Sequence, residues 1–288
     1  MSTVMQGDPN TAGIGQRLIV RSRPRFWLYL AGPVLVGATF GASTSDELMG
    51  GTLAALFLYF LVPANLLLYG VNDIFDQDLD TINPKKSVRE ARWSEDRLER
   101  AAIVIAGGLG LGTFLIVPPE GWIYLGGFFA FAWIYSAPPI RLKTVPGFDS
   151  IANGLYILPG AAAFVMLAGS HPPIAAIVGG WAWAMAMHAF SAIPDISSDR
   201  RGGIQTIATL LGSQRTLGFC ASCWIVATLA FASIDLRFVP IFGVYPLFVF
   251  GLWIGQFEIQ RAYWWFPPLN ASMGMVLTIA GILTVVAW

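Results

Sequence analysis

An acidic run that directly follows an apolar stretch is the feature of this sequence best suited to chemistry. If a helix continues through it at about 100° per residue, most of its polar side chains share one arc and Asp78 points away. Those that share the arc are Asn72, Asp73, Asp76 and Asp80. Carboxylates on one face repel each other, and a hard divalent cation such as magnesium, which prefers oxygen ligands, relieves that repulsion. The run therefore predicts a magnesium site, with a solvated helix end as the alternative.

The polar arc extends back into the apolar stretch. Asn65 and Tyr69 lie one and two turns before the acidic run and fall on the same face. Polar groups inside an apolar segment mark a pathway or a site more often than a simple helix end. This extension favours the site over the solvated helix end.

A second acidic pair, Asp195 and Asp199, has the four-residue spacing of neighbours on a helix face. His188 lies seven residues earlier, close to the same face unless Pro194 kinks the helix. A hydrogen-bonded core residue is the favoured interpretation of His188, and a role in the site is the alternative. Two carboxylate clusters at corresponding helix ends predict one cavity with a metal at each side. That arrangement suits a diphosphate held by magnesium ions.

Basic residues follow each acidic cluster and are candidates to neutralise the remaining phosphate charge. Anchoring to anionic lipid headgroups is the alternative role for such residues. The candidates are Lys85, Lys86, Arg89, Arg141, Lys143, Arg200 and Arg201.

Composition identifies the elements that must position these side chains. Hydrophobic residues make up 56% of the 288 and charged residues only 12%, with a mean hydropathy of +0.64. We predict an all-α integral membrane protein whose spans form one bundle around a central cavity. The formal net charge is zero, so no overall field favours nucleic acid. The nine predicted spans are 26–43, 51–71, 101–117, 121–136, 150–169, 173–194, 216–233, 239–256 and 269–287.

The basic residues also predict an orientation in the membrane. All of the 17 lysines and arginines except Arg237 lie in the N-terminal segment or in the loops after even-numbered spans. The positive-inside rule then places the N-terminus and the acidic clusters in the cytoplasm and the C-terminus outside. We expect a disordered tail over 1–16 and a single transmembrane domain over 17–288.

Three motifs together resemble the intramembrane aromatic prenyltransferase (UbiA-type) superfamily, and the resemblance covers the whole chain. They are the run Asn72-Asp73-x-x-Asp76-x-x-x-Asp80, the pair Asp195-x-x-x-Asp199, and the loop from Tyr135 to Lys143 that contains Ser-Ala-Pro-Pro-Ile-Arg-Leu. Longer strings resemble the lycopene elongase branch, whose members add a five-carbon unit to each end of lycopene. These strings are 68–76, 83–86, 149–156 and 188–195.

The resemblance implies roles for individual residues. The implied magnesium ligands are Asp73, Asp76, Asp80, Asp195 and Asp199. The implied contacts to the diphosphate are Asn72, Lys85, Arg89, Arg141, Lys143 and Arg201. Asp76 and Asp195 are the implied catalytic residues, and Tyr69 is the first candidate to stabilise a carbocation with its ring. Glu90 stands where the family often has proline, and Gln205 where quinone-pathway members often have lysine, so both departures weaken a quinone assignment.

The activity implied by the resemblance is a magnesium-dependent transfer of a prenyl group, dimethylallyl, from its diphosphate to a lipophilic acceptor. The branch implies that the acceptor is lycopene and that the protein works among membrane lipids. The same chemistry on a quinone precursor, an alcohol of a chlorophyll-like pathway or a lipid ether is the first alternative. A cation-coupled transporter is a distant one, because such proteins carry inverted repeats with interrupted helices, which this sequence lacks.

Overall fold

The computed structural model describes residues 13–77, 96–255 and 257–286, and within these ranges the chain is helical with no strand. The longer helices are α1 (Ile14–Arg21), α2 (Trp27–Gly41), α4 (Gly51–Leu61), α5 (Pro63–Phe75), α8 (Arg97–Gly112), α9 (Trp122–Ile134), α11 (Leu158–Ala168), α12 (Ile174–Ala192), α14 (Ile207–Ala232), α16 (Val244–Gly255) and α17 (Ile259–Val286). The short ones are α3 (Ser45–Leu48), α10 (Phe148–Ile151), α13 (Ile196–Arg201) and α15 (Val239–Phe242). The all-α prediction is confirmed.

Each predicted span coincides with a helix or with two consecutive helices. In the described ranges, seven helical segments are long and apolar enough to cross a membrane. The two other predicted spans correspond to α2 and α9, which have 15 and 13 residues, so nine is an approximate count of spans. Helix α17 begins well before the predicted span 269–287, because its first turn contains polar residues that interrupt the apolar pattern. Helix α14 is kinked at Gly212, whose φ of +74° and ψ of +169° are not helical, so its long part begins close to the predicted span 216–233.

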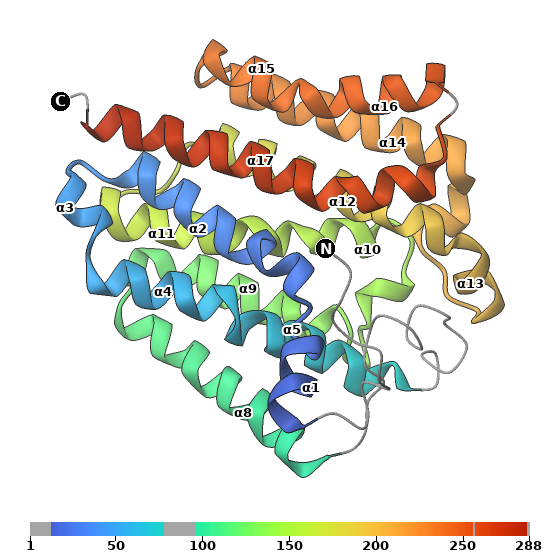
Figure 1. Cartoon of the computed structure of the whole chain (residues 1–288), viewed down its shortest axis with the longest axis horizontal. Coiled ribbons are helices and arrows are strands. Elements are labelled where there is room, and N and C mark those ends of the chain that lie inside the picture. Colours follow the sequence, from blue (N-terminus) through green and yellow to red (C-terminus); the bar gives the residue numbers. More distant parts are fainter. Residues whose placement is uncertain (1–12, 78–95, 256, 287–288) are drawn as a thin grey trace.

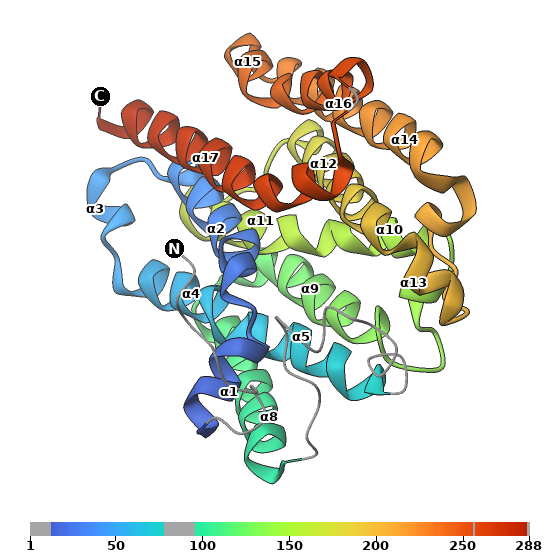
Figure 2. The same ribbon diagram turned by 45° about the vertical axis from the view of Figure 1, so that its right-hand side comes forward.

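The helices form one bundle whose ends differ (Figures 1 and 2). Helix α3 and the end of α17 lie at one end, and the ends of α5 and α13 lie at the other. Helices α1 and α8 form one edge of the bundle, and α14, α15 and α16 form the opposite edge. Both acidic clusters of the sequence are thus at the same end, as predicted, and the C-terminal helix finishes at the other.

Small residues allow the backbones of α2 and α11 to touch. A Cβ added to Gly37 of α2 would lie 1.9 Å from the carbonyl oxygen of Gly160 in α11. Membrane helices use such small residues for close van der Waals packing, since apolar burial gives no advantage over lipid. Around α12, by contrast, fully buried aromatic rings of Phe190, Trp224 and Phe266 fill the core. These contacts hold the walls of the cavity described next.

Candidate active site

A cavity of about 320 Å³ lies between α5, α12 and α13 at the end of the bundle where the acidic clusters meet. Its oxygen ligands come from Asn72 and Asp76 on one side and from Asp195 and Asp199 on the other. Its cationic side chains are Arg23 and Lys143. The apolar and aromatic lining residues are Phe26, Tyr29, Leu68, Tyr69, Tyr135, Leu155, Tyr156, Met187 and Tyr263. The predicted cavity between the two clusters is present.

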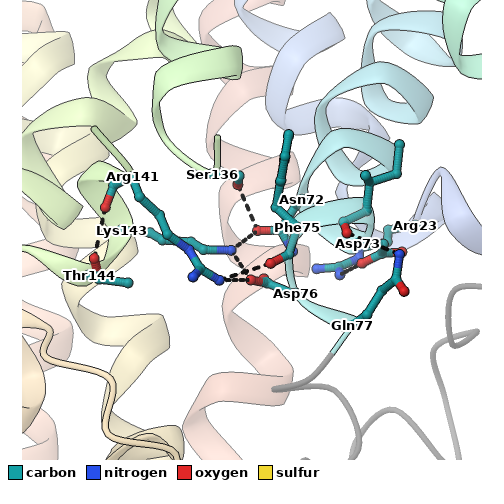
Figure 3. Close-up of polar contacts among 11 residues, drawn as sticks. Arg23, Asn72, Asp73, Phe75, Asp76, Gln77, Ser136, Arg141, Lys143 and Thr144 are labelled. Atoms are coloured by element: carbon teal, nitrogen blue, oxygen red, sulfur yellow. Dashed lines mark hydrogen bonds and ion pairs between the residues drawn. The ribbon is translucent and has the colours of Figure 1, made fainter. Parts of the chain in front are cut away.

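Asp76 ends helix α5 and receives two cations from the loop that follows α9 (Figure 3). The Asp76 carboxylate forms an ion pair with Lys143 and accepts a hydrogen bond from Arg141 at 2.9 Å. The side-chain oxygen of Asn72 accepts from the Ser136 hydroxyl at 3.0 Å and from Lys143 at 3.2 Å. The loop therefore brings Arg141 and Lys143 to the first acidic cluster, while their predicted contact with a diphosphate stays a prediction.

Two arginines at the site have backbone conformations that side-chain-bearing residues rarely adopt. Arg141 has φ of +46° and Arg23 has φ of +51°, and no other non-glycine residue in the described part of the chain has positive φ. The left-handed region costs a residue with a Cβ roughly 1–2 kcal/mol. Both guanidinium groups reach the first acidic cluster, since Arg23 contacts Asp73 and Arg141 contacts Asp76. Such strain is typical of residues that the surrounding structure holds for a function.

Asp73 does not line the cavity that Asp76 lines, so in this structure it does not stand beside Asp76 as the metal ligand that the resemblance implied (Figure 3). Its carboxylate, 2% exposed, pairs with Arg21 at 2.7 Å and Arg23 at 3.1 Å. Arg21 also contacts the buried Glu99 of α8 at 2.6 Å. The reason is rotation: Asp73 stands about 60° from Asp76 around the helix, at the edge of the predicted arc, and α1 lies against that edge.

Arg17 continues this buried charge network to the start of α8. Its guanidinium contacts Glu99 at 3.3 Å and also pairs with Asp96, the N-cap residue. The backbone N–H of Leu98 and the guanidinium of Arg17 lower the pKa of Asp96. The network, which we call the α1 ion network, consists of Arg17, Arg21, Arg23, Asp73, Asp96 and Glu99. It fastens α1 to α5 and α8 beside the cavity.

The second cluster lies where α12 tightens into one 3-10 turn at Ile193–Asp195 and continues as α13. Asp195 and Asp199 both line the cavity, as predicted. Arg201 is exposed and does not line it, so the structure does not bring this predicted phosphate contact to the site. His188 does line the cavity, which is the less favoured of the two interpretations made from the sequence.

Tyr69 lies in the cavity wall, but one of its ring faces is already covered. The guanidinium carbon of Arg23 stands 4.4 Å from the ring centroid, a cation–π distance. The Tyr69 hydroxyl lies 3.3 Å from that of Tyr156, whose ring packs edge-to-face on Tyr29. Three tyrosine rings, Tyr29, Tyr69 and Tyr156, thus line the cavity together.

Other predicted site residues lie outside the described ranges: Asp80, Lys85 and Arg89. Among the residues that the structure does describe, no three acidic, histidine or cysteine side chains are close enough to hold a metal by themselves. The cavity nevertheless offers carboxylate and amide oxygens from two sides, which suits magnesium, an ion that is bound through few carboxylates plus substrate phosphate.

Sequence reasoning missed several residues of the site: Arg23, Tyr29, Tyr156, Ser136 as a partner of Asn72, and Asp149 beside His188. Arg23 carried a weak signal, because it precedes Pro24 at the start of the first span. The others had no signal in spacing, since each is a single polar residue whose partner is distant in sequence.

A helical membrane bundle with opposed aspartate clusters at one cavity defines a class of intramembrane enzymes that handle phosphorylated substrates. Residues 30–284 match the model of the UbiA prenyltransferase family, and the chain belongs to that family. It is 50% identical over 281 residues to the lycopene elongase/hydratase of Haloferax volcanii, covering 96% of this chain and 93% of the relative. It is 52% identical over 270 residues to the lycopene elongase/hydratase of Halobacterium salinarum, and the match covers 93% of this chain and 98% of that relative.

The fold agrees with a solved structure of the same family. A UbiA homolog from Archaeoglobus fulgidus, determined with DMAPP and Mg2+ bound, superposes with a TM-score of 0.72 at 19% identity. The match covers 92% of this chain and 99% of that one. The family assigned from sequence motifs is therefore confirmed, and the chain is a prenyltransferase by family.

Proposed function

We propose that this prenyltransferase moves a dimethylallyl group from its diphosphate to the ends of lycopene, with magnesium as cofactor. Support for the acceptor comes from the two relatives of about half identity, both named lycopene elongase/hydratase, which match over nearly their whole lengths. Support for the donor and the metal comes from the Archaeoglobus fulgidus homolog bound to DMAPP and Mg2+. The observation in this structure that carries the proposal is the cavity between Asp76 and the pair Asp195 and Asp199.

Magnesium would be held by Asn72 and Asp76 on one side and by Asp195 and Asp199 on the other, with Asp80 as a further predicted ligand. When bound there, the metal acts as a Lewis acid that stabilises charge on the departing diphosphate. Asp73 is committed to the α1 ion network, so we assign it to positioning the end of α5. Because the Asp73 side chain is turned away from the cavity, Asn72 is better placed than Asp73 to hold magnesium together with Asp76.

Lys143, which lines the cavity, and Arg141, which reaches Asp76 from beside it, are the cations on Asp76 that could bind the diphosphate. In this structure they neutralise Asp76, and an incoming diphosphate would compete for the same cations. Lys85 and Arg89 remain predicted contacts, whereas Arg201 would have to turn inward from an exposed position. Positive groups fixed around the leaving oxygens stabilise the charge that develops there during ionisation.

The deeper half of the cavity suits the carbocation that remains after diphosphate leaves. Tyr29, Tyr69 and Tyr156 present aromatic rings there, and each ring contributes roughly 0.5–2 kcal/mol to holding a cation. Leu68, Leu155 and Met187 complete an apolar wall. Exclusion of water matters at this depth because a free allylic cation reacts with water.

We further propose that the end of the bundle carrying both acidic clusters faces the cytoplasm, with the C-terminus outside and residues 17–288 acting as one domain. The charge asymmetry supports this orientation, and the structure supports the opposite placement of the clusters and the end of α17. The predicted tail 1–16 falls mostly outside the described residues, and from Ile14 onward it is part of α1.

The proposal is tested by incubating membranes with magnesium, dimethylallyl diphosphate and either lycopene or 4-hydroxybenzoate. Chromatography and mass measurement should detect C45 and C50 carotenoids, and their formation should stop when magnesium is chelated. Prenylated hydroxybenzoate beside unchanged lycopene would refute the acceptor but keep the prenyltransferase.

A further inference from the structure

We infer that His188, oriented by Asp149, is the base that accepts the proton released when the carotenoid cation is quenched. The inference rests on the proposed function, because it concerns the last step of prenyl transfer to an alkene. Attack of the acceptor double bond on the allylic cation forms a carbon–carbon bond and leaves a cation on the acceptor. That cation becomes neutral only if a proton leaves, so the site needs a base.

His188 lies at the correct depth for this role. It is seven residues before Asp195, which places it about 10 Å deeper along α12 at a rise of 1.5 Å per residue. Tyr69 is likewise seven residues before Asp76 on α5, so the two side chains lie at similar depths on facing walls. The diphosphate belongs near the aspartates, and the reacting carbons therefore lie near Tyr69 and His188.

The imidazole is turned so that one nitrogen faces a buried carboxylate. His188 Nε2 lies 3.5 Å from Oδ2 of Asp149, a residue with no exposed surface. The Tyr135 ring packs edge-to-face on the imidazole at 6.1 Å between centroids. With Nε2 directed at Asp149, Nδ1 is the nitrogen left to take a proton from a molecule in the cavity. Nε2 makes no hydrogen bond in this structure, and the carboxylate 3.5 Å away on that side of the ring would stabilise the imidazolium that forms.

Asp149 does not need His188 to stay in place. Its carboxylate accepts the backbone N–H of Gly147 at 2.7 Å and that of Ile207, the first residue of α14, at 3.1 and 3.2 Å. These bonds already fix the carboxylate between α10 and α14. The contact with His188 therefore serves the histidine rather than the aspartate, which argues against a purely structural pair.

Other side chains in the cavity are poor candidates for the base. The carboxylates of Asp76, Asp195 and Asp199 lie at the end proposed to bind metal. Arg23 and Lys143 pair with aspartates and are cationic. Among the lining residues in the described ranges, His188 is the only one with an imidazole ring.

The proposed step balances by either of two routes. In elimination, the electron pair of a C–H bond beside the cationic carbon becomes the new double bond, and the proton moves to Nδ1 of His188. In hydration, the oxygen of a water molecule bonds to the cationic carbon, and one of its protons moves to the same nitrogen. Both end with a neutral carotenoid and a histidinium paired with Asp149.

The test compares His188→Gln with a matched control, His171→Gln, in protein reconstituted into lipid vesicles with magnesium, labelled dimethylallyl diphosphate and lycopene. His171 is the only other histidine of the chain, is exposed, and contacts Tyr124 outside the cavity. Diphosphate release, labelled carotenoid and the KM for lycopene are measured together. For His188→Gln we expect release to persist and KM to stay constant, while carotenoid formed per diphosphate released falls on the order of 100-fold. The label should then appear in dimethylallyl alcohol, because the new carbon–carbon bond of the unquenched cation breaks again and water captures the allylic cation that returns. The control should match the wild type.

Each other outcome has one meaning. An unchanged ratio in His188→Gln, whether or not the rate falls, would overturn the inference and leave a diphosphate oxygen as the base. Where the ratio falls and KM rises, His188→Ala is supplemented with imidazole or with pyrazole, a ring of similar size and much weaker basicity. If imidazole restores the carotenoid formed per diphosphate released and pyrazole does not, His188 acts as a base. If both compounds restore this ratio equally, or if neither does, the inference is overturned. Absence of diphosphate release from the wild type would refute the proposed function instead.

Discussion

Replacement of Glu99 by glutamine tests whether the α1 ion network holds the wall of the site. Glu99 has no exposed side-chain surface and contacts Arg21 at 2.6 Å and Arg17 at 3.3 Å. Glutamine keeps the volume and one oxygen, but it removes the charge and turns an amide N–H₂ toward a guanidinium. Arg21, which is also fully buried, would keep only Asp73 as an anionic partner among the contacts described above.

The expected loss follows from the burial of the pair. Breaking a buried ion pair from one side costs about 3–5 kcal/mol, and the remaining partner of Arg21 puts this variant near about 3 kcal/mol. For a chain of this length, roughly 2 °C of melting temperature is lost per kcal/mol, so Tm should fall by about 6 °C.

Thermal unfolding of the purified protein in one detergent, followed by intrinsic fluorescence, measures this loss. Glu120→Gln is the matched control, because Glu120 is exposed at the start of α9 and its replacement should leave Tm within about 1 °C. If Glu99→Gln has the same Tm as Glu120→Gln, the α1 ion network contributes nothing to stability. That result would refute the positioning role given to Asp73.

Three other predictions follow from the same structure. Asp76→Ala and Asp195→Ala should each abolish prenyl transfer while the protein still accumulates folded in the membrane; turnover in either variant would contradict the ligand assignment. Gly160→Ala should cost about 1–3 kcal/mol, since its Cβ would meet a backbone oxygen of α2 at 2.5 Å, whereas Gly218→Ala, which meets nothing within 4 Å, should not lower Tm. A reporter fused after Trp288 should behave as external, and cytoplasmic activity there would reverse the proposed orientation.

The sequence predicted most of the fold because apolar length is a direct consequence of the bilayer. Where it failed, at the start of α17, polar residues form the first turn of a helix that continues beyond the apolar stretch; before α14 it missed the short helical segment that ends at the Gly212 kink. Gln214 and Arg215 lie inside α14, and Gln260 and Arg261 inside α17. Helix formation there depends on neighbouring helices, which hydropathy does not encode.

The site was predicted where spacing carries the information and missed where tertiary contact does. Asp76, Asp195 and Asp199 line one cavity. The sequence could predict this because each residue follows an apolar stretch at a helix end and because helical spacing gives the face on which it lies. Asp73 was misplaced because its orientation is decided by Arg21, which lies 52 positions earlier in the chain. The pairing of His188 with Asp149 likewise depends on how α10 packs against α12.

Expression of this chain in a host that makes lycopene, but makes no carotenoid with more carbon atoms than lycopene, tests the central claim most directly. Mass measurement of the extracted pigments should show C45 and C50 carotenoids, with or without added hydroxyl groups, and the same host expressing Asp76→Ala should contain lycopene only. Unchanged lycopene in cells where the wild-type protein is folded in the membrane would contradict the assignment of lycopene as the acceptor.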